Sequence, residues 1–281
     1  MKTKRFLFLL PLIALVSCST LGQQISREAA LEKAEAIEAE EFEPTEATFE
    51  ARISSNNNYG KDDTKESSQG SALVALNYLG EDEAAPEMHY KSDSKRSADG
   101  DNTRETIDFY LVKSGDDEWA SYVKYYNSVS MDEAETKAYE GSFTEVSASV
   151  ATYISSITTM GSMMKMYLKP VNLINSMSSD DEESQKALEE AGQKASFYSS
   201  GDKNLAIKYN YNRPSSDEES EDDHENTLSS SYTIEYKNNR LVKVESSSKS
   251  SYGNKSSSKM TFTYKNSIKI SLPKGWDGYL E

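Results

Sequence analysis

Short segments in which apolar and polar residues alternate constrain this chain more than any other feature of its sequence. In residues 48–54, apolar side chains alternate with Glu50 and Arg52, a spacing typical of a β-strand with one buried face. The same pattern returns at 71–78, 87–92, 106–113, 118–128, 205–211, 232–236, 242–244, 260–264 and 268–272. Because the joins between these segments are mostly short, we expect neighbouring strands to run antiparallel.

The predicted turns are rich in Gly, Asn and Asp, residues that accept turn conformations readily. They fall at 56–60, 80–82, 99–102, 114–117, 237–240 and 265–267. One longer segment, 215–227, carries seven acidic residues and no apolar residue. We predict that this segment is a disordered acidic loop.

Helical patterns interrupt the strands. Ser26 is a predicted N-cap for a helix that runs to about residue 41, and further helices are predicted at 131–139 and from Asp180 to about residue 195. The strongest amphipathic stripe lies at 144–169 and is expected to end or kink at Pro170, with its apolar character continuing to residue 177.

The first 18 residues predict how the chain is located. Basic residues precede an apolar run at 6–16, which is well short of the roughly 20 residues that span a bilayer, so the run is typical of an export signal. The run ends in Leu15, Val16, Ser17 and Cys18, which resembles the lipobox of bacterial lipoproteins. An ordinary signal peptide with an unrelated cysteine, or an uncleaved anchor, are the alternatives.

The lipobox resemblance implies cleavage before Cys18 and a diacylglyceryl group on its sulfur. Residues 1–17 would then be a signal peptide, 18–25 a lipidated tether, and 26–281 a single domain. We expect the protein in the cell envelope, attached to a bacterial membrane through Cys18, with its domain on the extracytoplasmic side. Two acyl chains are enough for lasting attachment.

The order of elements resembles the LolA-like and LppX-like families of exported lipid carriers. The matching segments are the helix at 26–41, the strand from 48, the helices at 144–177 and the closing strands at 260–273. The resemblance implies an α+β fold with a curved antiparallel sheet, a half-barrel with helices packed on its concave side. In those families the half-barrel encloses an apolar cavity.

Net charge excludes one class of partner. The full chain carries −16, and removing residues 1–17 takes away three basic residues, which leaves about −19. Such a chain should be repelled by nucleic-acid phosphates, so no nucleic-acid partner is predicted. Protein partners cannot be predicted from the sequence. Because Cys18 is the single cysteine, no disulfide is available to the domain.

Motifs for catalysis and metal binding are weak. Residues 121–124 fit S-x-x-K, but the K-T-G element of the enzymes that use that motif is missing, and the only histidines are His89 and His224. The acidic runs would bind divalent ions weakly at most, because their order does not match a calcium loop. We predict no enzymatic activity, no cofactor and no metal site, and a hydrolase ranks last among the hypotheses.

The amphipathic stripe supplies the predicted ligand site. Methionine and aromatic side chains are adaptable and often line apolar cavities. The predicted cavity residues are Val150, Tyr153, Ile157, Met160 and Met164. We predict that they bind an apolar ligand such as lipid between the sheet and the helices. The alternative is a structural or adhesion lipoprotein in which this helix packs onto the sheet and fills the core.

Overall fold

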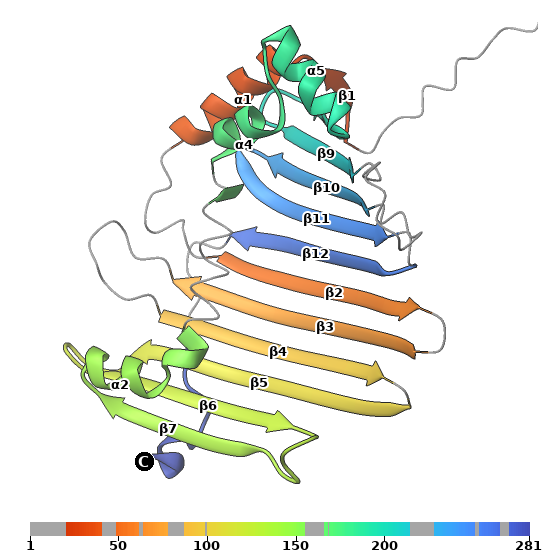
Figure 1. The fold of residues 1–281 in the computed structure, drawn as a ribbon. Coiled ribbons are helices and arrows are strands. Elements are labelled where there is room, and N and C mark those ends of the chain that lie inside the picture. Colours follow the sequence, from red (N-terminus) through yellow and green to blue (C-terminus); the bar gives the residue numbers. More distant parts are fainter. Residues whose placement is uncertain are drawn as a thin grey trace, which may run out of the picture.

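A computed structural model describes residues 21–40, 49–61, 64–77, 87–98, 100–154, 166–167, 169–213, 228–250, 253–264 and 270–281. These residues form one 12-stranded sheet in the order β1-β8-β9-β10-β11-β12-β2-β3-β4-β5-β6-β7, and the paired strands run antiparallel (Figure 1). The sheet is open, with β1 and β7 at its two edges. The predicted α+β class with an antiparallel sheet is therefore confirmed.

The elements and their bounds are, in chain order, β1 (Gln23–Ile25), α1 (Arg27–Ala39), β2 (Phe49–Lys61), β3 (Thr64–Asn77), β4 (Glu87–Ala98), β5 (Asp101–Lys113), β6 (Trp119–Asn127), β7 (Glu135–Gly141), α2 (Phe143–Ser149), α4 (Pro170–Met177), α5 (Glu182–Glu190), β8 (Gln193–Ser199), β9 (Leu205–Arg213), β10 (Leu228–Lys237), β11 (Arg240–Ser250), β12 (Lys255–Tyr264) and the 3₁₀ helix η2 (Trp276–Tyr279). Strand β1 uses the last residues of the predicted tether.

The strands are longer than the alternation predicts. The predicted turn at 56–60 is wrong, because these residues lie inside β2. Residues 56–58 pair with both β12 and β3, and Tyr59 and Gly60 pair with β3. In this stretch the Asn57 amide donates to the Ser68 hydroxyl across the pair at 3.1 Å. Neighbouring strands on both sides supply a complete set of backbone partners, which outweighs the turn preference of Asn and Gly.

Two further predictions need correction. The helix expected at 131–139 is wrong, because Glu135–Gly141 form β7 and pair with β6. Residues 270–272 are not a strand, and Ile270 instead packs on Val112. Pro170 begins α4 at its first turn, where the missing N–H costs no hydrogen bond.

Other turns and caps follow the prediction. Ser26 caps α1 by accepting from the Ala29 N–H at 3.2 Å. Asn238 and Asn239 take φ values of 51° and 58° between β10 and β11, as a tight hairpin turn requires. Three other predictions lie outside the described residues, namely the turns at 80–82 and 265–267 and the acidic loop 215–227. The described residues nearest to that loop are Arg213 and Leu228.

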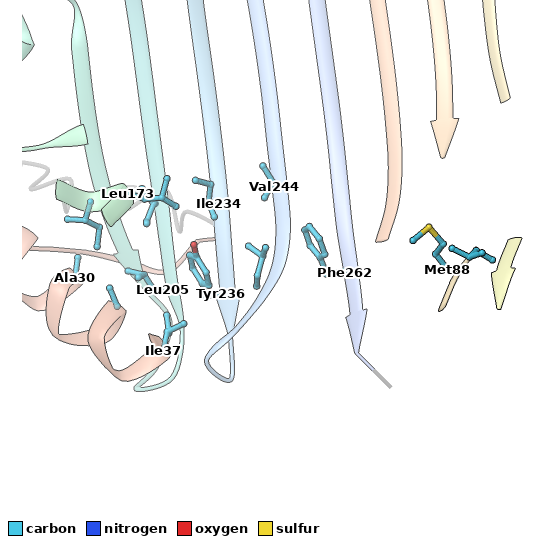
Figure 2. Close-up of a cluster of buried hydrophobic side chains, with 14 of the residues drawn as sticks. Ala30, Ile37, Met88, Leu173, Leu205, Ile234, Tyr236, Val244 and Phe262 are labelled. Atoms are coloured by element: carbon cyan, nitrogen blue, oxygen red, sulfur yellow. The ribbon is translucent and has the colours of Figure 1, made fainter. Parts of the chain in front are cut away.

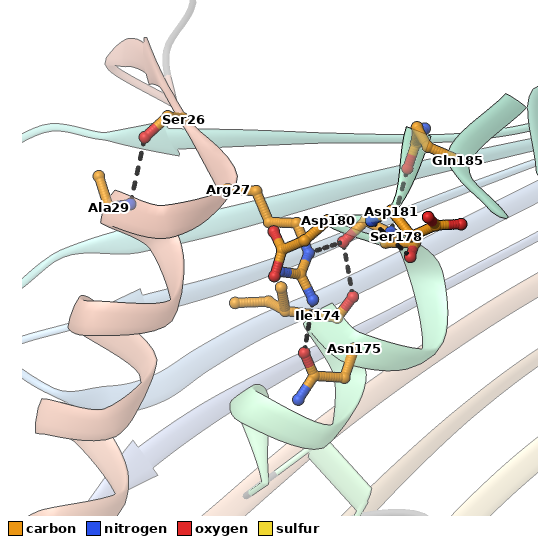
Figure 3. A network of polar contacts seen from close by, with 10 residues as sticks. Ser26, Arg27, Ala29, Ile174, Asn175, Ser178, Asp180, Asp181 and Gln185 are labelled. Atoms are coloured by element: carbon orange, nitrogen blue, oxygen red, sulfur yellow. Dashed lines mark hydrogen bonds and ion pairs between the residues drawn. The ribbon is translucent and has the colours of Figure 1, made fainter. Parts of the chain in front are cut away.

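A partly buried arginine joins three helices at the β1 edge. Arg27 of α1 donates to the Ser178 hydroxyl at 3.0 Å and to the Asn175 amide oxygen at 2.6 Å, and it forms an ion pair with Asp180 (Figure 3). The Ser178 hydroxyl in turn donates to the Ile174 carbonyl at 2.7 Å. Since these partners lie in α4 and in the turn before α5, the guanidinium fixes the helices relative to one another.

Candidate ligand-binding face

The inner face of the sheet is the one against which α1, α2 and α4 pack. Its central row of side chains is set by register, because residues directly opposite one another point to the same side. Ile207, Ile234, Val244 and Met260 follow one another in this row across β9, β10, β11 and β12. The first three are buried and Met260 is partly buried, so the inner face carries a continuous apolar strip.

Buried apolar residues of the inner face lie beside both groups of helices. At the β1 end, Ala30, Ile37 and Leu173 of the helices pack near Leu205 and Ile234 (Figure 2). Val244 and Phe262 continue the strip through the middle strands, and Met88 lies farther along it. At the β7 end α2 contacts β6 and β7.

The structure places two of the five predicted cavity residues on this strip. Val150 is 1% exposed and belongs to the core cluster, and the Tyr153 ring stacks on Phe109 at a centroid distance of 5.6 Å. Both contact neighbours closely rather than facing open space. The other three, Ile157, Met160 and Met164, lie outside the described residues, as does Cys18.

Tyrosines introduce polar groups into the strip. The Tyr236 hydroxyl donates to the Tyr167 carbonyl at 2.5 Å, which holds Tyr167 above β10. Burial raises the pKa of Tyr236 and of Tyr264, so both phenols are neutral at physiological pH. The Arg240 guanidinium lies 5.5 Å from the centre of the Tyr264 ring and opposes part of that shift.

Aromatic residues mark where the strip meets the serine-rich part of the inner face. Tyr209 and Tyr232 lie directly opposite each other, with ring centroids 6.3 Å apart. Tyr232 is 38% exposed and Met166, next to Tyr167, is 51% exposed. The strip therefore has an accessible apolar border at β9 and β10.

The outer face carries a histidine–carboxylate contact that the sequence did not distinguish. His89 Nε2 lies 2.9 Å from Asp108 Oδ1, and the imidazole stacks on Tyr110 at 4.0 Å. Burial, with Asp108 as the next cause, raises the pKa of Tyr110 to about 12. Tyr122 and Tyr279 extend this aromatic group, with ring centroids 6.2 Å apart.

The S-x-x-K match does not assemble into a catalytic pair. Ser121 pairs with Leu111 and Tyr139, which places it on the inner face, where it is fully buried. Lys124 lies three residues later along the same strand, so its side chain points to the outer face. A serine nucleophile and a lysine base must lie within hydrogen-bond distance of each other. Here the side chains of Ser121 and Lys124 lie on opposite faces of the sheet.

In the part of the chain that the structure describes, no three His, Cys, Asp or Glu side chains gather as metal ligands would. None of the described helices has both the length and the apolar composition needed to cross a bilayer.

The structure also shows hollows that the sequence did not predict. Two adjoining hollows lie over β10, β11, β12 and β2, and a third lies over β4 and β5 and reaches Asn127 and Val129. All three are lined mainly by polar residues. The serine, asparagine and lysine residues that line the hollows are typical of solvated loops in a sequence. Only the pairing of the strands shows that these residues lie on one surface.

Comparisons with known proteins give a distant structural likeness. No protein-family model matches the chain. No curated protein matches it either. The crystal structure of a beta-barrel-like protein of domain of unknown function DUF1849 from Brucella abortus aligns over 78% of this chain and 98% of that chain. The identity is 8% and the TM-score 0.25, so the likeness supports no conclusion about function.

Proposed function

We propose that this protein is an exported bacterial lipoprotein, anchored through Cys18, that binds an apolar ligand such as lipid on its inner face. The observation that carries the proposal is the apolar strip across β9, β10, β11 and β12, together with the buried apolar residues of β4, β5 and β6 near the second group of helices. Its accessible border at Tyr232 and Met166 gives an acyl chain a route of approach. Burial of acyl methylenes supplies about 0.8 kcal/mol each.

The arrangement around the strip supports a half-barrel of the LolA-like kind. The sheet is open, and α1, α2 and α4 pack on one of its faces (Figure 1). Tyr153 and Tyr167 flank the segment that carries the predicted residues Met160 and Met164, and both tyrosines pack against the core of the inner face. We therefore retain Met160 and Met164 as proposed ligand contacts.

Native mass spectrometry tests ligand binding directly. The domain from Ser19 onward would be exported from a bacterial host and purified without detergent. We expect a stoichiometric excess mass that solvent extraction removes and identifies as lipid. A domain that stays at its polypeptide mass, even after incubation with phospholipid vesicles, would contradict the proposal.

A pair of substitutions on one strand locates the ligand. Met260 points to the inner face and Thr263 to the outer face of β12. Met260→Glu should abolish the excess mass, because a carboxylate would be buried against the acyl chain. Thr263→Glu should keep it. Circular dichroism of both variants checks that each is folded.

A second function is favoured by the close packing of Val150 in the core and of the Tyr153 ring on Phe109. The protein would then be a surface interaction lipoprotein with a filled core. A bare polypeptide mass together with capture of a surface partner would favour it.

Anchoring is tested separately from ligand binding. Cys18→Ala should release the full-length protein from membranes into the soluble fraction, because the thioether to the lipid can no longer form. If detergent were still required for extraction of the variant, the lipobox assignment would be wrong.

A further inference from the structure

The outer face carries a polar trough across four strands. It consists of two adjoining hollows of about 360 and 380 Å³ that share Asn56, Ser231, Ser247 and Ser257. The remaining lining residues of the outer face are Asn58, Ser229, Thr233, Glu245, Lys249, Lys255 and Lys259. The hollows also touch the strands at Ser246, Ser248, Ser256 and Ser258, whose side chains point to the inner face. Ligand sites commonly occupy hollows of this size.

Two lysines in the trough lie directly opposite each other. Register pairs Lys249 of β11 with Lys255 of β12, and among the described residues neither ammonium has an ion pair. Like charges directly opposite on a sheet destabilise it. Such a pair stands out in a chain with a net charge of −16, which has many carboxylates that could have taken one of these positions.

The other charged groups of the trough leave its potential positive. Glu245 is shared between Lys259 at 3.3 Å and Lys243 at 3.2 Å, so it is already neutralised. Hydrogen bonds and charge from these two lysines lower the pKa of Glu245 against the opposing effect of burial, which keeps it ionised. Among the described residues that line the trough, no carboxylate therefore compensates the Lys249–Lys255 pair.

The neutral lining residues are hydroxyls and amides. Serine and asparagine side chains both donate and accept hydrogen bonds, as the hydroxyl groups of a sugar do. Lys255 and Lys259 are four residues apart on one strand, about 13 Å along the trough, so a ligand contacting both must carry charge at intervals.

We propose that the outer trough binds an acidic glycan, a chain of sugars that carries carboxylate or phosphate groups. The ammonium groups of Lys249 and Lys255 bind one anionic group together, and Lys259, which also contacts Glu245 at 3.3 Å, lies near the next. Ser231, Ser247 and Asn56 between them bind sugar hydroxyls. The inference concerns the outer face and does not depend on ligand binding at the inner face.

The lining favours a glycan over nucleic acid. Binding of single strands relies on aromatic side chains that stack on bases, and duplex recognition relies heavily on arginine. The lining residues named above include neither aromatic side chains nor arginine.

Calorimetry with the domain from Ser19 onward tests this proposal, with oligogalacturonate as the acidic probe and dextran as the neutral one. We expect binding of the acidic probe only, weakening as salt is added. The double variant Lys249→Gln/Lys255→Gln should weaken it about tenfold or more. Lys194→Gln/Lys208→Gln makes the same charge change on the outer face of β8 and β9, outside the trough, and should change affinity less than about twofold.

Four results would overturn the proposal. They are absence of binding to oligogalacturonate, equal losses in the two double variants, equal binding of dextran, and tighter binding of a DNA oligonucleotide or of anionic phospholipid vesicles than of the glycan. Lipid loading measured by mass is expected to be unchanged in the Lys249→Gln/Lys255→Gln variant. A change in glycan binding alone therefore separates this inference from the inner-face function.

Discussion

The same strands pass through two different environments. One half of each long strand contributes to the apolar strip, as Phe109 does in β5 and Phe262 does in β12. The other half is polar on both faces, as at Thr103 and Ser256 of the same two strands. The comparison teaches that the register can be set in the apolar half and carried by the backbone ladder into a region with no core of its own.

Cross-strand side-chain pairs support the polar half. Arg104 donates two hydrogen bonds to the Asp93 carboxylate, at 3.0 and 2.7 Å, and these lower the pKa of Asp93. Ser248 and Ser256 share a hydrogen bond of 2.7 Å. Exposed pairs of this kind contribute only about 0.2–1 kcal/mol each, so the two halves should respond very differently to substitution.

The largest expected difference lies within β5. Phe109 is fully buried, so Phe109→Ala should lower the free energy of unfolding by about 3–5 kcal/mol. Thr103 points to the same face in the polar half, and Thr103→Ala should cost less than about 1 kcal/mol. Urea unfolding of both variants measures the difference. Equal losses would show that the polar half is packed as tightly as the apolar half.

The dependence of stability on alkaline pH should reveal the burial of Tyr110 in the aromatic group of the outer face. Because the pKa of Tyr110 is raised to about 12, the unfolded chain loses this proton first, from about pH 10. Stability should therefore be unaffected below that pH and fall as the pH rises from about 10 towards 12. In Tyr110→Phe this decline should be smaller. Urea midpoints from pH 8 upwards measure it, and an unchanged slope would contradict the assignment.

Serine pairs in the polar half should tolerate replacement by better strand formers. Ser246 and Ser258 lie directly opposite each other on the inner face. Replacing both with threonine should raise the free energy of unfolding by up to about 1 kcal/mol, because β-branched residues fit the pleated surface. The matched change Val244→Thr in the apolar half should lower it, since it buries a hydroxyl. Thermal melts of the two variants would show opposite shifts.

The smallest expected effect concerns the Lys249–Lys255 pair. Lys249→Glu replaces a repulsive pair with an attractive one and should add a few tenths of a kcal/mol at low salt. The gain should disappear at high salt. If the variant were instead less stable at low salt, the two ammonium groups would not be close enough to repel each other.

Sequence reasoning succeeded where burial determines structure. Apolar alternation predicted the apolar parts of β5, β6, β9, β10 and β12, and the Ser26 cap and the Asn238–Asn239 turn are confirmed. It failed at 56–60, where local preference favours a turn but two neighbouring strands supply the hydrogen bonds. Such partners are far away in sequence, so a local pattern cannot reveal them.

The helix expected at 131–139 failed for a related reason. Asp132 and Glu133 suit the first turn of a helix, yet β6 offers an unpaired edge to Glu135–Gly141. The candidate site was predictable in part. The amphipathic stripe correctly indicated that Val150 and Tyr153 meet the sheet, but the trough on the outer face depends on register and gave no local signal.

Strand β1 determines how the molecule would stand on a membrane. Gln23 already pairs with Ser199, so only five residue steps separate Cys18, the proposed site of the lipid, from the edge of the sheet, at most about 18 Å of extended chain. Twelve strands make eleven spacings, up to about 53 Å along the sheet. An anchored molecule would hold its β1 edge at the headgroups, while β7 could reach far into the surrounding space. A force applied to β7 would then act perpendicular to the strands, on the hydrogen bonds between each strand and the next.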